Sequence, residues 1–116
     1  MDKLLVILRK PPYGVVNAAE AVRHAGASAG FDYEATLYLI DSGVLTAKRN
    51  QEAGGSGFSG LGESLEMMSD EMEIYACRNS LNESGLKEDD LIEGVKIDNG
   101  HVLKDALKNA QSVMIY

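Results

Sequence analysis

Apolar and polar positions alternate along this chain in blocks that predict strands and helices in turn. Leu4 to Leu8 is a continuous apolar run, which is typical of a strand buried on both faces of a parallel sheet. Pro11 and Pro12 follow it and cannot donate to a sheet ladder. From Val15 to Ala29, small and apolar residues recur every three or four positions, which predicts an amphipathic helix ended by a glycine. A strand over residues 32–40 completes a βαβ unit.

The rest of the chain continues this alternation. We expect one or two helical turns at 44–48, a helix at 61–69, a strand at 72–76 followed by a short helix, a helical turn at 87–92, a strand at 95–97, a helix at 103–110 and a strand at 113–116. The pattern predicts a three-layer α/β/α fold around a mostly parallel sheet of about five strands. We expect residues 1–116 to form one domain.

Residues 50–62 are rich in glycine and serine, and we expect a mobile loop there. Within it, Gly55 to Gly60 has the glycine spacing of dinucleotide-binding loops. That motif requires a strand directly before it, so that the phosphates meet the first amides of a helix. The residues from Lys48 to Ala53 are polar and do not indicate a strand, so we do not expect a nucleotide site in this loop.

Composition narrows the classes of partner. The 116 residues carry a formal net charge of −7, which disfavours contact with nucleic acid or an anionic membrane. The run from Leu4 to Leu8 is too short for a signal peptide or a membrane span. His24 and His101 have no second ligand at metal-binding spacing, so we expect no metal and no cofactor. With one cysteine there is no internal disulfide, and we expect a cytoplasmic protein.

That cysteine, Cys77, stands where a predicted strand ends and a helix begins. Ser80 and Glu83 have the spacing of a capping box, and Gly85 is a typical helix stop. Unpaired amides at the helix start and the neighbouring Arg78 favour the thiolate, which is the reactive form of cysteine. The alternative is that Cys77 is a small buried hydrophobe.

Other candidate residues are expected at the same sheet edge. Asp41 follows the second predicted strand, and the Tyr13-Gly14 turn follows the first. Open α/β sheets bind ligands beyond the carboxyl ends of their strands, so these residues and Cys77 are expected close to one another. Asp41 is also a residue type that caps helices, and that interpretation stays open.

Several segments, in this order and spacing, resemble the DsrE/DsrF-like sulfur-relay family, which includes the TusC and TusD components and the YchN-like homo-oligomers. They are Pro12-Tyr13-Gly14, residues 37–44, Ile74-Tyr75-Ala76-Cys77 with Ser84-Gly85-Leu86 downstream, residues 91–97 and residues 112–116. The resemblance extends over nearly the whole chain.

The resemblance implies that Cys77 is a sulfur carrier of the sulfurtransferase type, served by sulfur donor and acceptor proteins. It also implies a homotrimer or a homohexamer. A persulfide on Cys77 would be held by amides near Asn79 and Ser80 and by Arg78. Some relatives have a second cysteine where this chain has Ser80, so a partner thiol would have to release the sulfur.

Two other functions remain open from the sequence. One is a small-ligand or nucleotide-binding oligomeric module in which Cys77 is merely buried. The other is a peroxide-sensing thiol protein, because an exposed thiolate oxidises readily.

Overall fold

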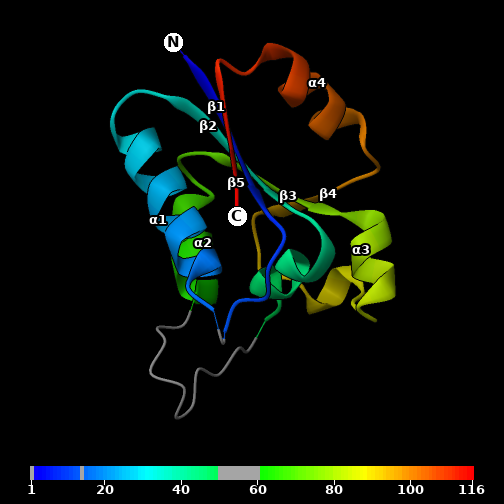
Figure 1. The fold of residues 1–116 in the computed structure, drawn as a ribbon. Coiled ribbons are helices and arrows are strands. Elements are labelled where there is room, and N and C mark those ends of the chain that lie inside the picture. Colours follow the sequence, from blue (N-terminus) through cyan, green and yellow to red (C-terminus); the bar gives the residue numbers. More distant parts are fainter. Residues whose placement is uncertain (1, 14, 50–60) are drawn as a thin grey trace.

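The computed structural model describes residues 2–13, 15–49 and 61–116. In chain order it contains β1 (Lys3–Leu8), α1 (Asn17–Gly30), β2 (Glu34–Leu39), the 3-10 helix η1 (Asp41–Ala47), α2 (Leu61–Met68), β3 (Glu73–Cys77), α3 (Arg78–Glu83), the 3-10 turn η3 (Glu88–Asp90), β4 (Val95–Asp98), α4 (His101–Asn109) and β5 (Ser112–Ile115). Within these residues, five strands pair in parallel in the order β4-β3-β2-β1-β5 (Figure 1). The predicted α/β fold with a parallel sheet is confirmed.

One face of the sheet is closed by α1 and α2, which lie side by side in Figure 1. The residues of α1 that turn toward the sheet are small, and Ala18, Ala21 and Ala25 are fully buried. Short side chains let the helix approach the strands closely. Leu61 and Leu65 of α2 join the same core.

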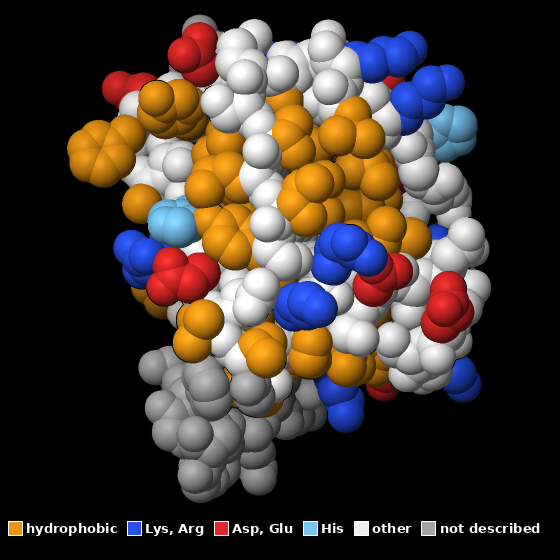
Figure 2. All heavy atoms as spheres, viewed as in Figure 1, with side chains coloured by type: hydrophobic (Ala, Val, Ile, Leu, Met, Phe, Trp, Pro, Cys, Tyr) orange, Lys and Arg blue, Asp and Glu red, His pale blue; other side chains and the backbone are white. Residues whose placement is uncertain are grey.

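The opposite face of the sheet is covered less completely. Leu5, Ile7 and Tyr38 are buried there beneath α4, yet no side chain of α4 itself is fully buried. Val113 and Ile115 of β5 are the register partners of Leu5 and Ile7, and they are 40% and 63% exposed. Figure 2 shows hydrophobic side chains gathered on this face, over β5 and the neighbouring part of α4.

The capping-box prediction is wrong. Helix α3 begins at Arg78 with Cys77 as its N-cap, so Ser80 lies inside the first turn and not before it. The Ser80 hydroxyl accepts a hydrogen bond from the amide of Asp41, a partner distant in sequence, which overrides the local rule. The helix stop is confirmed, because Gly85 has a φ of +72° and the amide after it donates to Leu81.

Other boundaries shift by a few residues. Val15 was expected on the buried stripe of the first helix, but it precedes α1 and is 39% exposed. The second strand begins at Glu34 and not at residue 32, because Asp32 has a left-handed backbone with a φ of +65°. Gly62, expected in the loop, belongs to α2. Residues 50–60 of that predicted loop lie outside the described residues.

Candidate functional site

Cys77 lies at the carboxyl end of β3, between β2 and β4. Its backbone is still extended, with φ −69° and ψ 124°, while the next residue starts α3. The side chain is half-buried, is not in a disulfide and packs against the cluster that contains Leu5, Ile7 and Tyr38. The sulfur therefore sits on the α4 side of the sheet, where the apolar cover is thin.

A buried carboxylate is next to Cys77 on β4. Asp98 is the register partner of Cys77 and is only 6% exposed. Tyr38, fully buried on β2, donates its hydroxyl hydrogen to Asp98 Oδ2 at 2.6 Å. The backbone amides of Gly100, Val102 and Leu103 donate to the same carboxylate at 3.0, 3.1 and 3.3 Å. Asp98 thus fastens the start of α4 to the sheet beside Cys77.

These contacts set the ionisation of both partners. Burial opposes the charge on Asp98, but the hydrogen bonds from Tyr38 and from the three amides outweigh it and hold the pKa of the carboxyl below its usual value. Burial, followed by the hydrogen bond to Asp98, raises the pKa of the Tyr38 phenol. At neutral pH the pair is therefore a phenol donating to a carboxylate.

Asp41 lies at the same carboxyl edge of the sheet as Cys77, just after β2. Its backbone is left-handed, with a φ of +53°, and its amide donates to Ser80 Oγ at 2.8 Å. Its carboxylate is exposed and accepts a hydrogen bond from Arg9 Nε at 3.1 Å. Next to it, a Cβ on Gly43 would lie 2.1 Å from the carbonyl oxygen of Leu8, so only glycine fits there. The ends of β1 and β2 and the first turn of α3 are thereby joined.

The remaining predicted site residues lie around this edge with different partners. Arg78 is exposed, and its Nε donates to Asn99 Oδ1 at 3.0 Å in the turn before α4. Asn79 is exposed and Tyr13 is half-buried in the turn after β1. Gly14 lies outside the described residues. The structure thus joins Asp41 to Ser80 directly, and it turns Arg78 toward Asn99.

Sequence reasoning missed the Tyr38–Asp98 pair. Residues 98–100 were interpreted as a turn only, although an aspartate directly after a strand and before a helix is a capping signal. Tyr38 lies in an apolar run and offers no local sign that its hydroxyl has a buried partner.

Within the described ranges, no three His, Cys, Asp or Glu side chains gather as metal ligands would. Nor does any helix in these ranges combine the length and apolar character that crossing a bilayer requires.

The sequence matches known proteins along almost its whole length. The model of the DsrE/DsrF-like family matches residues 2–116. The intracellular sulfur oxidation protein DsrF of Allochromatium vinosum is 33% identical over 95 residues, which cover 80% of this chain and 70% of that protein. A TusC homolog of Aliivibrio fischeri is 24% identical over 123 residues, which cover 100% of both chains.

The fold has a close counterpart among solved structures. The crystal structure of the YchN protein from E. coli superimposes with a TM-score of 0.90, over 100% of both chains and at 22% sequence identity. At that identity the superposition supports the fold alone. It agrees with the arrangement of strands and helices described above.

Proposed function

The chain belongs to the DsrE/DsrF-like sulfur-relay family, and from that premise we propose that it is a cytoplasmic sulfur carrier whose Cys77 accepts persulfide sulfur and passes it to a partner protein. The observation that carries the proposal is the place of Cys77, half-buried at the carboxyl end of β3 and at the N-cap of α3. The names of the DsrF and TusC relatives support a sulfur-relay role.

The position of the thiol suits an anionic sulfur. The first amides of a helix have no carbonyl partner within that helix, and in α3 these are the amides of Arg78, Asn79 and Ser80. These amides follow the N-cap residue, Cys77, directly in the chain. The helix dipole also favours a negative charge at this end of the helix. The Arg78 guanidinium adds a positive charge one residue away. In this proposal Asp41 and Tyr13 belong to the pocket around the persulfide, and Gly14, predicted with them, lies outside the described residues.

The transfer is two thiol exchanges. In the first, the Cys77 thiolate attacks the outer sulfur of a donor persulfide, the donor S–S bond breaks, and the donor thiol leaves as thiolate. In the second, an acceptor thiolate attacks the outer sulfur now on Cys77, and the Cys77 thiolate leaves. Each step forms one S–S bond and breaks one, so no external oxidant or reductant is needed.

Release of the sulfur requires the partner thiol. Ser80 occupies the position where some relatives have a second cysteine, and its hydroxyl is engaged with the Asp41 amide. The acidic chain, with a net charge of −7, favours encounter with a partner of basic surface.

The direct test is incubation with a small-molecule persulfide donor followed by intact mass measurement. We expect the wild-type protein to gain one sulfur atom and Cys77→Ser to gain none, and native alkylation of Cys77 should block loading. Ser84→Ala, an exposed substitution just past α3, is the matched control and should load normally. Wild-type protein that gains no sulfur while remaining open to alkylation would refute the proposal.

The same experiment separates the other functions. A thiol that resists alkylation in the native state would favour a ligand-binding module without thiol chemistry. A sulfenic acid trapped on Cys77 after peroxide treatment, without sulfur loading, would favour a peroxide sensor.

We also propose that the protein assembles as a homotrimer or homohexamer. All-parallel sheets normally have both faces covered, whereas here Val113 and Ile115 of β5 and Leu107 of α4 are exposed on one face. Sedimentation should report a multimer that Ile115→Glu dissociates and that Met67→Glu, an exposed position on α2, leaves intact. A monomeric wild-type protein at micromolar concentration would overturn this part of the proposal.

A further inference from the structure

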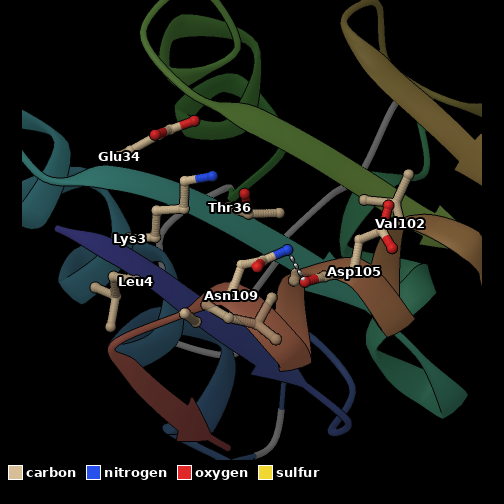
Figure 3. A pocket seen from close by; sticks show the side chains of 10 residues that line it. Lys3, Leu4, Glu34, Thr36, Val102, Asp105 and Asn109 are labelled. Carbon is tan, nitrogen blue, oxygen red and sulfur yellow. Dashed lines mark hydrogen bonds between the residues drawn. The ribbon is translucent and has the colours of Figure 1, made fainter. Parts of the chain in front are cut away.

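A concave feature lies at the opposite end of the sheet from Cys77. It is a cavity of about 180 Å³ between the amino ends of β1 and β2 and the second half of α4. Cys77 is the last residue of β3, whereas Lys3 and Glu34 are the first residues of β1 and β2, so the cavity and the thiol are at opposite edges. In Figure 3, Lys3, Glu34 and Thr36 come from the strands, and Asp105 and Asn109 come from the helix.

The cavity is lined by apolar and polar side chains together. Along α4 and just past its end, Leu103, Ala106 and Ala110 pack against the cluster of Leu5, Ile7 and Tyr38. The apolar part of the lining is Leu4, Leu5, Val102, Ala106 and Ala110, and the polar part is Lys3, Glu34, Thr36, Asp105 and Asn109.

The charged groups of the cavity have no protein partners among the described residues. Lys3 and Glu34 are direct register neighbours, yet no ion pair forms between them. Elsewhere on the sheet, Lys96 and Glu73 form an ion pair at 2.6 Å. Asp105 also forms no ion pair in the described ranges, and Asn109 uses only its amide nitrogen, which donates to the Asp105 carbonyl at 2.9 Å. One ammonium, two carboxylates and the Asn109 carbonyl thus remain available to a ligand.

We propose that this cavity binds a small α-amino acid. The ligand carboxylate pairs with Lys3 on β1, the ligand ammonium pairs with Asp105 on α4, and Thr36 contacts the ligand side chain. A volume of about 180 Å³ suits a ligand with a short side chain. A ligand with only a negative charge would be repelled by the carboxylates of Glu34 and Asp105. A ligand with only a positive charge would leave the Lys3 ammonium without a partner.

The test uses NMR titration of the full chain in the Cys77→Ser background, which removes thiol chemistry and separates this site from the sulfur-carrier proposal. L-serine and L-cysteine are the probes, and propylamine and propionate each carry only one of the two charges. We expect the amino acids to shift the amide resonances of Lys3, Thr36 and Asp105 saturably, and the single-charge compounds to bind at least about tenfold more weakly.

Substitutions at the rim identify the contacts. Lys3→Met and Asp105→Asn should each weaken binding by about tenfold or more, because each removes a charged hydrogen-bonding partner. Both side chains are exposed, so the fold is retained. Lys108→Met and Asp89→Asn, exposed residues away from the cavity, should leave binding unchanged. No saturable shift at millimolar probe, or propylamine binding as tightly as L-serine, would overturn the assignment, whatever the outcome of sulfur loading.

Discussion

Removal of the Tyr38 hydroxyl tests the arrangement that holds α4 beside Cys77. Tyr38 is fully buried and donates to Asp98 Oδ2 at 2.6 Å. A hydrogen bond to a charged group contributes about 1.5–3 kcal/mol, and in Tyr38→Phe the carboxylate keeps its three amide donors. We therefore expect the free energy of unfolding to fall by about 2 kcal/mol. For a domain of this size the midpoint of thermal unfolding should fall by about 8 °C.

The stability lost in Tyr38→Phe should decrease as the pH falls. The folded-state pKa of Asp98 is below its usual value, so its contribution to stability is present above the unfolded pKa of about 3.9 and is lost as the pH falls through the folded value. Tyr38→Phe removes one of the groups that lower this pKa. The difference in unfolding free energy between wild type and Tyr38→Phe should thus be largest near neutral pH and shrink below about pH 4.

The measurement is urea-induced unfolding, followed by circular dichroism at several pH values. Tyr33→Phe is the control, because Tyr33 is 45% exposed and its loss should change stability by less than about 0.5 kcal/mol. If Tyr38→Phe and Tyr33→Phe unfold alike at neutral pH, or if the difference between Tyr38→Phe and wild type grows on acidification, the account of Asp98 is wrong.

Three further substitutions test the contacts at the carboxyl edge of the sheet and the end of α1. For each, the free energy of unfolding is measured by chemical denaturation. Gly43→Ala should destabilise by about 3 kcal/mol, since its Cβ would lie 2.1 Å from the Leu8 carbonyl oxygen, and a near-neutral result would contradict this close approach. Gly30→Ala, with nothing within 4 Å of the new Cβ, should stabilise by about 0.4–1 kcal/mol, and a loss of stability would show that the site is not open. Ser80→Ala should cost about 1–2 kcal/mol because the Asp41 amide loses its acceptor, and no cost would mean that water replaces the hydroxyl.

The fold was predictable because its signals are local. Leu4 to Leu8 is apolar on both faces, which only a central parallel strand accommodates, and Gly85 ends a helix through its own backbone geometry. The carboxyl-edge position of Cys77 and Asp41 follows from the strand assignments alone.

The predictions that failed, and the pair that was missed, concern residues that contact each other but are far apart in the sequence. Ser80 and Glu83 have the sequence spacing of a capping box, but in the structure the Ser80 hydroxyl accepts a hydrogen bond from the Asp41 amide, 39 residues away. Tyr38 and Asp98 are 60 residues apart, and nothing near either residue indicates the other. Such contacts depend on strand order, which the alternation of apolar runs does not specify.

The two faces of the sheet differ in how completely the helices cover them. The α1 side is a packed apolar core whose residues, such as Val6 and Leu37, are fully buried. The α4 side holds Cys77, the Tyr38–Asp98 pair, the cavity next to Asp105 and the exposed Ile115. Exposed side chains on that side make few buried contacts, so their substitution changes chemistry or assembly and leaves the fold intact. If the proposed sulfur loading is lost in such a variant, the site itself is implicated, whereas the same loss after truncation of a buried residue on the α1 side can follow from unfolding.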